Sequence, residues 1–343
     1  MSKNIGILTG GGDCLGLNPA IRGAVMRGLD HGYTFTAFLE GWRGLVEGKT
    51  RSLVLEDVQD IAKLGGTILK SSRTNPFKKE GAVQKCLDNL KKFKIDALIA
   101  LGGEDTLGVA TRLYEEHKVN TVGVPKTMDN DLSGTDFTFG FDTAAALAVE
   151  AAERLKDTGS SHMRIMVLEV MGRHAGWVAL YTGIASAADW ILLPEKEPEI
   201  ERMCAHLKVA HARKGVALVI ASEGTELPQY KNVKQEVDQF GHMLLKDRGV
   251  GDDLAKIIEK NTGIETRSAT IGHMQRGGPP SLFDRILGLR VGAAAADAVK
   301  RNDFGKMMAI RGTEVVAVPL KEATGTLKTV PKEWLEFAEI FWK

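Results

Sequence analysis

Six short apolar segments, each running into a Gly-rich or polar turn and then into a helical pattern, constrain the fold of this chain most strongly. They cover residues 5–8, 97–101, 121–124, 164–170, 216–221 and 269–271. Apolar runs that alternate with helical patterns indicate strand–loop–helix units, whose strands lie parallel. Because ligands of open α/β sheets bind at the carboxyl ends of the strands, we expect the polar loops to line one cleft or two facing ones.

Length and charge narrow the class of protein. The 343 residues correspond to about two domains at roughly 150 residues each. No apolar stretch approaches the ~20 residues that a membrane-spanning helix needs, so we expect no membrane contact. Lys and Arg number 45 against 44 Asp and Glu, and this balance gives no overall basic field for binding nucleic acid.

The start of the chain and its cysteines predict a cytoplasmic protein. The apolar run after Asn4 is too short for a signal peptide. Cys14, Cys86 and Cys204 are odd in number and far apart, which fits neither a disulfide framework nor a metal site. We expect them to be reduced and structural.

Three further segments carry predictions about organisation. The Ala-rich stretch 143–155 predicts a long helix at the boundary between the two halves of the chain. The polar residues 227–253 predict a helical excursion on the surface. Near the C-terminus, Trp334, Phe337, Ala338 and Phe341 have helical spacing, which predicts a face packed on the body of the protein.

The first polar loop, residues 10–13, is rich in glycine. Consecutive glycines after a strand let backbone N–H groups approach a phosphate, although a tight strand-to-helix turn would explain the same residues. The chain has neither G-x-G-x-x-G nor G-x-x-x-x-G-K-[ST], so a Rossmann dehydrogenase and a P-loop enzyme are not supported.

The next two loops add carboxylates. Glu104 and Asp105 follow two glycines, which suits a phosphate site neutralised by hydrated Mg²⁺. Asp129 and Asp131 lie two residues apart after a strand, as expected where one carboxylate accepts a hydroxyl proton and the other positions the metal or the site. Solvated turn carboxylates are the alternative.

The second half of the chain supplies cations near strand ends. The planar guanidinium suits phosphate binding and can stabilise a transferring phosphoryl group, although any single arginine could instead form an ion pair. Glu223 either accepts a hydrogen bond from a sugar hydroxyl or caps a helix. The cationic candidates are Arg164, Arg173, Arg267, Arg276 and His273.

Taken in order, seven motifs over about residues 4–300 resemble those of the phosphofructokinase family. They are Gly11-Gly12-Asp13, Ser72-Arg73, Gly102–Thr106, Pro125–Asp131, Met171–Gly176, Ser222-Glu223-Gly224 and Gly272–Gly278. Each motif is loose, but seven in the same order at similar spacing identify the chain as a member of the family. The resemblance implies two Rossmann-like α/β domains with the active site in the cleft between them. Residues 1–140 and 279–325 would form the donor domain, and residues 141–278 and 326–343 the fructose 6-phosphate domain.

The resemblance also implies the reaction, a Mg²⁺-dependent phosphoryl transfer to the 1-hydroxyl of fructose 6-phosphate, as used in glycolysis or gluconeogenesis. Asp129 would act as the general base, and Thr127 and Asp131 would position the reacting groups. Arg173 and the N–H of Gly12 would stabilise the phosphoryl group in flight, and Lys126 would also belong to the catalytic residues.

The same resemblance assigns the substrate contacts. The sugar phosphate would be bound by Asp131, Arg164, Met171, Gly172, Glu223, Arg267, His273 and Arg276. The donor would be bound by Gly11, Gly12, Arg73, Gly103, Asp105, Thr106 and Lys126, with Glu104 at the metal. Because family members take the residues matching Arg164 and Arg267 from a neighbouring subunit, we expect a homodimer or homotetramer.

Two departures from the ATP-using pattern predict the phosphoryl donor. Asp105 and Lys126 replace glycines of G-G-D-G-[ST] and P-G-T-[IM]-D-N-D. At ~4 Å and an effective dielectric of ~20, a carboxylate would repel the α-phosphate of a nucleotide by about 4 kcal/mol, or about a thousandfold in affinity. A lysine instead suits compact pyrophosphate, so the pair resembles the pyrophosphate-dependent branch, whose reaction is expected to be reversible.

Four alternatives stay open. The chain could be an ATP-dependent phosphofructokinase that tolerates Asp105, or could act on sedoheptulose 7-phosphate. Lipid and NAD kinases use a loop like residues 102–106 but leave His273 and Arg276 unexplained. An inactive regulatory subunit would have little reason to keep Asp129 and Arg173.

Overall fold

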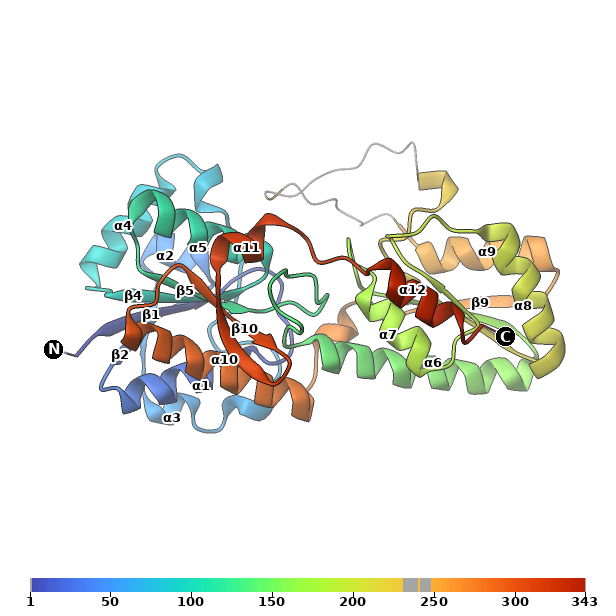
Figure 1. Cartoon of the computed structure of the whole chain (residues 1–343), viewed down its shortest axis with the longest axis horizontal. Helices are drawn as coiled ribbons and strands as arrows, with labels where there is room; N and C mark the ends of the chain where they lie inside the picture. Colours follow the sequence, from blue (N-terminus) through green and yellow to red (C-terminus); the bar gives the residue numbers. More distant parts are fainter. Residues whose placement is uncertain (1, 231–239, 241–247, 343) are drawn as a thin grey trace.

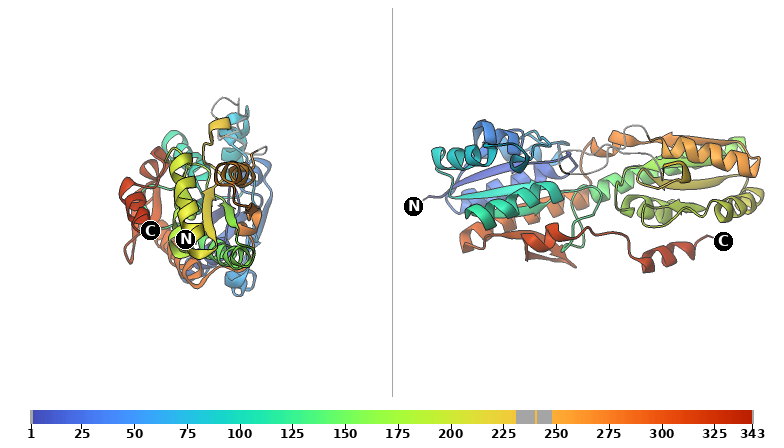
Figure 2. Two further views of the ribbon diagram at one scale, coloured as in Figure 1. Left: turned by 90° about the vertical axis from the view of Figure 1, so that its right-hand side faces the viewer. Right: turned by 90° about the horizontal axis from the view of Figure 1, so that it is seen from above.

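The computed structural model describes residues 2–230, 240 and 248–342. The chain forms two lobes that lie end to end, each built on its own sheet (Figures 1 and 2). Of the described helices, none combines the length and the apolar character needed to cross a bilayer.

The first lobe contains a seven-stranded sheet in the order β11-β10-β5-β4-β1-β2-β3. Only β3 and β11, at the two edges, pair antiparallel. The central strands β1, β4 and β5 are almost wholly buried, which explains their continuous apolar sequences. The strands are β1 (Asn4–Thr9), β2 (Thr34–Phe38), β3 (Thr50–Leu53), β4 (Ala97–Gly102), β5 (Thr121–Pro125), β10 (Lys306–Arg311) and β11 (Glu314–Pro319).

Helices cover both faces of this sheet. One face carries α1 (Leu17–Asp30), α3 (Leu55–Val58) and α10 (Leu282–Arg301), and the other carries α2 (Trp42–Glu47), α4 (Ala82–Lys92), α5 (Glu104–His117) and α11 (Leu320–Gly325). The backbones of helices α1 and α10 lie close together. A Cβ at Gly292 would lie 2.1 Å from the Ala20 carbonyl oxygen, so this packing requires glycine at that position. Short 3₁₀ turns occupy Ile61–Lys63 and Pro76–Lys78.

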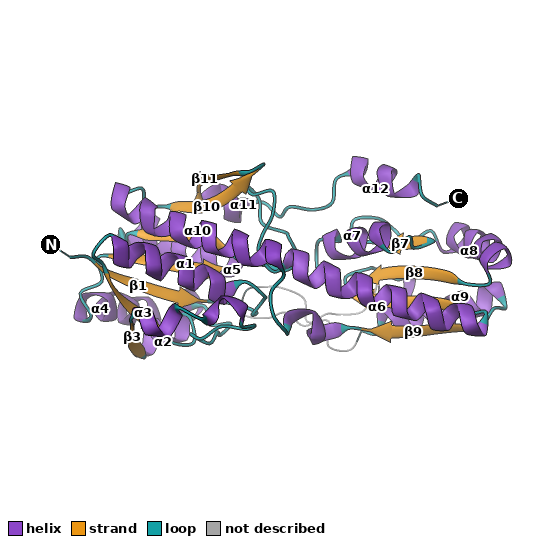
Figure 3. Cartoon of the chain, turned by 90° about the horizontal axis from the view of Figure 1, so that it is seen from below, coloured by secondary structure: helices purple, strands orange, loops and turns teal. Residues whose placement is uncertain are grey.

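The second lobe contains a four-stranded, fully parallel sheet in the order β7-β8-β6-β9. Its strands are β6 (Ile165–Val170), β7 (Trp190–Leu192), β8 (Ala217–Ser222) and β9 (Thr266–Thr270). Helices α6 (Phe141–His162), α7 (Trp177–Ala185) and α12 (Lys332–Glu339) pack on one face, and α8 (Ile200–Lys214) and α9 (Val250–Thr262) on the other. Helix α6 begins at the junction of the lobes (Figure 3). Further 3₁₀ turns occupy Pro228–Tyr230 and Gly272–Arg276.

The predicted fold class, an α/β protein with mostly parallel sheets, is confirmed. All six predicted segments contain strands, although β9 begins at Thr266 and ends before Ile271. The helix predicted over 143–155 is the middle of α6. The domain boundaries after residues 140, 278 and 325 stay a prediction, which the separate sheets of the two lobes support.

The prediction for the C-terminal face is confirmed for two of its four residues. Ala338 is buried, and the Trp334 ring centre lies 6.2 Å from that of Trp177 and 5.5 Å from that of Tyr181 on α7. Phe337 and Phe341 are instead 44% and 56% exposed, and Leu335 and Trp342 also pack on the lobe. Apolar residues lie on both candidate faces of α12, so helical spacing alone does not decide which face turns inward.

The excursion predicted for residues 227–253 falls largely outside the described residues, at 231–239 and 241–247. Within its described part, Pro228–Tyr230 is a 3₁₀ turn and α9 begins at Val250.

Candidate active site

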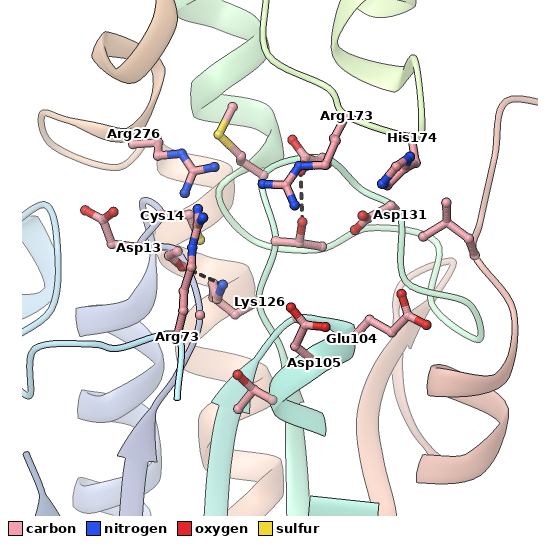
Figure 4. A pocket seen from close by; sticks show the side chains of 18 residues that line it. Asp13, Cys14, Arg73, Glu104, Asp105, Lys126, Asp131, Arg173, His174 and Arg276 are labelled. Atoms are coloured by element: carbon pink, nitrogen blue, oxygen red, sulfur yellow. Dashed lines mark hydrogen bonds between the residues drawn. The ribbon is translucent and has the colours of Figure 1, made fainter. Parts of the chain in front are cut away.

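A cavity of about 110 Å³ lies where loops from the carboxyl ends of both sheets meet (Figure 4). The loops after β1, β4, β5 and β6 contribute to it, together with the 3₁₀ turn at 272–276 and the chain after α11. The lining residues are Gly11, Gly12, Asp13, Cys14, Arg73, Gly103, Glu104, Asp105, Thr106, Lys126, Thr127, Met128, Asp129, Asp131, Arg173, His174, Arg276 and Leu327. Most of the residues predicted for catalysis and donor binding are therefore brought together.

The Gly-rich loop after β1 brings the two lobes into contact. The Gly11 N–H donates to the Ser72 carbonyl oxygen at 3.1 Å, which holds the loop beside Arg73. A Cβ at Gly12 would lie 2.0 Å from Nη1 of Arg276, which comes from the second lobe. Any side chain at position 12 would therefore push Arg276 away from the loop.

Lys126 crosses from the end of β5 to the same loop. Its Nζ donates to the Gly12 carbonyl oxygen at 2.6 Å, and only 5% of the residue is exposed. Burial lowers the pKa of the Lys126 ammonium, with the neighbouring Arg276 acting in the same direction. The ammonium is thus fixed beside the Gly-rich loop.

Two carboxylates occupy the first turn of α5. Gly103 is the N-cap, and Glu104 and Asp105 follow it. Both acidic side chains lie at the cavity (Figure 4). A helix N-terminus carries a partial positive charge that favours anions, and here protein carboxylates already lie in that field.

The loop after β5 is locked by hydrogen bonds that leave one oxygen unused. Asn130 has a left-handed φ of 52°, and its Oδ1 accepts from the Thr138 N–H at 3.1 Å. The Thr138 hydroxyl donates to the Thr127 carbonyl oxygen at 2.6 Å. Oδ1 of Asp129 is buried and has no hydrogen-bond partner among the described residues. Such an oxygen suits a substrate hydroxyl or a cation.

Carboxylates crowd one another in and beside the cavity. Burial, followed by the charge of Asp129, raises the pKa of Asp131 to about 6. The same two causes, in the same order, raise the pKa of Glu223 to about 7. Arg73, Lys126 and Arg276 lie across the cavity from Glu104 and Asp105, and Arg173 enters from the second lobe (Figure 4). The site therefore offers several cations to a polyanion beside carboxylates that would accept a metal ion.

Some predicted sugar-phosphate residues lie just outside the cavity. The Met171 N–H donates to Oε1 of Gln275 at 2.8 Å, and Gly172 N–H approaches Oε1 of Glu223 at 3.5 Å. His273 lines an adjoining hollow that shares Gly11, Gly12, Asp13, Arg73 and Arg276 with the cavity.

Arg164 and Arg267 lie away from the cavity in this chain. Arg164 precedes β6 and Arg267 lies near the start of β9, so both are at the amino ends of their strands. Both pair with Glu265, at 2.9 and 2.5 Å. Their predicted role in a neighbouring subunit's site stays a prediction.

Several residues of the site have no role predicted from the sequence. Asp13 and His174 line the cavity and lie inside two of the seven motifs, and Gln275, inside another motif, accepts a hydrogen bond from the Met171 N–H. Cys14 lies beside the Gly-rich loop, where burial raises the pKa of its thiol to about 12. Leu327 follows a helix far from any motif, so no local signal points to it.

The described residues contain no group of three or more His, Cys, Asp or Glu side chains arranged to hold a metal ion. This does not conflict with magnesium, which usually binds through one or two carboxylates, waters and substrate phosphates.

The sequence was compared with the profiles of known protein families. The Phosphofructokinase family profile matches residues 4–299. The chain belongs to the phosphofructokinase family.

Individual relatives carry two different names. Over 99% of both chains, the protein is 51% identical to a pyrophosphate–fructose 6-phosphate 1-phosphotransferase of Dictyoglomus thermophilum. Over 98% of both chains, it is 46% identical to an ATP-dependent 6-phosphofructokinase 2 of Streptomyces coelicolor. The fold resembles that of a pyrophosphate-dependent phosphofructokinase from Nitrosospira multiformis, with a TM-score of 0.85 and 20% identity over 97% of this chain and 87% of the other.

The raised pKa of Glu223 predicts a pH-dependent effect on stability. A carboxyl group with a folded pKa near 7 and an ordinary value of 4.5 favours the protonated form in the folded state. Its contribution to stability is therefore lost as the pH rises from about 4.5 through about 7. Glu223→Gln should raise the free energy of unfolding at pH 8 by about 2 kcal/mol and leave it nearly unchanged at pH 4.5.

Urea unfolding at the two pH values measures this difference. Exposed Glu201 provides the control, because Glu201→Gln should change stability little at either pH. An equal gain for Glu223→Gln at both pH values would contradict the assignment.

Proposed function

We propose that the protein transfers a phosphoryl group from pyrophosphate to the 1-hydroxyl of fructose 6-phosphate, giving fructose 1,6-bisphosphate and phosphate. The observation that carries the proposal is that Asp105 and Lys126 both line the cavity, at the place where the donor is proposed to bind. The name of the Dictyoglomus relative supports the same donor.

Asp105 disfavours a nucleotide for a local reason. The amino end of α5 would otherwise attract a phosphate, and Glu104 with Asp105 places two negative charges there. A nucleotide α-phosphate near Asp105 would meet repulsion of about 4 kcal/mol at ~4 Å and an effective dielectric of ~20.

Lys126 favours a compact donor. Its Nζ lies 2.6 Å from the Gly12 carbonyl oxygen, so the positive charge lies beside the Gly-rich loop at which the donor phosphate is proposed to bind. Arg73 lines the same side of the cavity. Pyrophosphate needs no adenosine contacts and has a high charge density, which these cations match.

Asp129 is the proposed general base. As the 1-hydroxyl oxygen bonds to the transferred phosphorus, Asp129 accepts the hydroxyl proton and the bond to the departing phosphate breaks. The Asp129 N–H donates to Oγ1 of Thr127 at 3.1 Å, which orients the base. Asp131 positions the reacting groups, and Arg173 with the Gly12 N–H stabilises the charge on the phosphoryl group in flight. The reverse reaction returns the proton from Asp129.

Magnesium fits the carboxylates of the cavity. Glu104 is the proposed ligand. Two observations support a cation nearby: Oδ1 of Asp129 is buried without a hydrogen-bond partner among the described residues, and the pKa of Asp131 is raised. A bound cation would stabilise the charged form of both carboxylates. The bound ion would neutralise phosphate charge and hold the donor in place.

The sugar phosphate is proposed to lie toward the second lobe. Met171, Gly172, Glu223, His273 and Arg276 would hold it, and the raised pKa of Glu223 allows its carboxyl group to donate or to accept a hydrogen bond with a hydroxyl. We also propose a cytoplasmic homodimer or homotetramer. In this assembly Arg164 and Arg267 would complete a neighbouring subunit's site.

An ATP-dependent reaction is the second candidate, because the Streptomyces relative carries that name at 46% identity. Initial rates of fructose 1,6-bisphosphate formation with Mg²⁺ and either pyrophosphate or ATP separate the two. We expect turnover with pyrophosphate alone. Turnover with ATP alone would overturn the donor assignment while keeping the site, and sedoheptulose 7-phosphate in a third assay tests the acceptor.

Variants of Asp105 test whether its carboxylate excludes ATP. Asp105→Gly should admit ATP by removing the repulsion, and Asp105→Asn should do so more weakly because the side-chain volume remains. ATP affinity should rise by up to about a thousandfold, with poor turnover while Lys126 stays. Binding is measured by calorimetry, and a Gly variant that still shows no ATP binding rules out Asp105 as the gate.

Asp129→Ser tests the base. The loss of a general base should lower kcat on the order of 10²–10⁴-fold, with little change in fructose 6-phosphate affinity, because the base acts in the transition state. Exposed Asp157 on α6 gives the control variant Asp157→Ser, which should keep wild-type rates. Equal losses of binding and turnover would argue against this role.

A further inference from the structure

The segment 326–331, which joins α11 to α12, passes from the first lobe to the second (Figure 1). Leu327 of this segment lines the active-site cavity. No catalytic or binding role has been assigned to its residues above.

The segment is paired with the loop that carries Asp129 and Asp131. Leu327 forms an antiparallel bridge with Leu132. The Lys328 N–H donates to the Asp131 carbonyl oxygen at 2.9 Å, and the Ser133 hydroxyl donates to the Thr326 carbonyl oxygen at 2.6 Å. These bonds fix the backbone immediately after the proposed base.

The side chain of Lys328 holds the far end of the same loop. Its Nζ donates to the carbonyl oxygens of Thr135 at 3.1 Å and Asp136 at 2.7 Å. Burial lowers the pKa of Lys328 to about 8, while Asp136 and Asp131 act in the opposite direction. A half-buried ammonium that donates to two loop carbonyls restricts how the loop can move.

Lys328 also contacts the second lobe. Nε1 of Trp177 donates to the Lys328 carbonyl oxygen at 2.9 Å, and the Lys328 Nζ lies 5.3 Å from the centre of the Trp177 ring. Trp177 is the first residue of α7, four residues after Arg173. One residue therefore connects the loop of the proposed base with the helix that follows the proposed phosphoryl-stabilising arginine.

We propose that Lys328 is a positioning residue for phosphoryl transfer, which holds the loop of Asp129 and Asp131 in register with the loop of Arg173. This inference rests on the proposed function, in which Asp129 must accept the hydroxyl proton while Arg173 stabilises the phosphoryl group that the same hydroxyl attacks. A displacement of about 1 Å between such groups can cost about a hundredfold in rate.

The test compares the wild-type protein with Lys328→Met in the assay of fructose 1,6-bisphosphate formation from pyrophosphate. The substitution keeps an unbranched side chain and removes the charge. We expect kcat to fall about ten- to a hundredfold while KM for both substrates stays within about twofold, because no proposed substrate contact is removed. Lys328→Arg should recover much of the rate, since a guanidinium can donate to both carbonyls and lie against Trp177. Lys332→Met is the matched control, because the Lys332 side chain on α12 is 83% exposed, and it should leave kcat unchanged.

Trp177→Phe provides a second variant that retains an aromatic ring but removes the N–H bond to Lys328. It should lower kcat in the same direction with little change in KM. Thermal unfolding of every variant separates a loss of fold from a loss of rate. Two results would overturn the inference. One is a Lys328→Met protein with wild-type kcat; the other is a fall in kcat that matches the loss of folded protein and is not recovered by Lys328→Arg.

The proposed function fails separately. Wild-type turnover with ATP alone would overturn the pyrophosphate donor, and the same variants would then be compared with ATP. A wild-type chain silent with both donors would overturn both proposals.

Discussion

The approach of Arg276 to Gly12 joins the two lobes at the point where chemistry is proposed. A Cβ at position 12 would lie 2.0 Å from Nη1 of Arg276, so any side chain there would displace the guanidinium from the Gly-rich loop. Lys126 donates to the Gly12 carbonyl oxygen. Two cations from different parts of the chain therefore meet at Gly12, and the acidic loops face them across the cavity (Figure 4).

The balance of charge in the cavity accounts for much of its proposed chemistry. Burial, and after it the charge of Asp129, raises the pKa of both Asp131 and Glu223. A polyphosphate bound with a metal ion brings both signs of charge, so it can pair with the arginines and the carboxylates at once. Binding of such a ligand should therefore lower the repulsion among the carboxylates of the site.

The sequence predicted those parts of the fold and site that depend on local pattern. The central strands of both sheets are continuous apolar runs. The loops after β1, β4, β5 and β6 meet at one cavity as expected, whereas Glu223 in the loop after β8 lies outside its lining. Strands β2, β3, β7, β10 and β11 lie outside the predicted segments. Strand β2 alternates polar and apolar residues and β7 has only three residues, whereas β10 contains the apolar run Met307–Ile310, so its sequence does carry a strand signal. Lys328 and Leu327 reach the site through contacts with residues about 195 positions earlier in the chain, such as the bond from Lys328 Nζ to Thr135, and no local pattern encodes such contacts. Near the C-terminus, the packing of Trp334 and Ala338 follows from the helical spacing, whereas the exposure of Phe337 and Phe341 does not, because apolar residues lie on both sides of the helix.

Donor choice is decided by far fewer residues than the fold. Relatives of similar identity over nearly the whole chain carry names with different donors, so the sheets, the lobes and most of the cavity are compatible with either. The discriminating charges must therefore lie where a nucleotide extends beyond pyrophosphate, at its α-phosphate and adenosine. Asp105 lies in the first turn of α5, where the helix N-terminus would otherwise favour that phosphate, and Lys126 lies beside the Gly-rich loop. We therefore expect these two side chains, which follow β4 and β5, to be the main determinants of the donor.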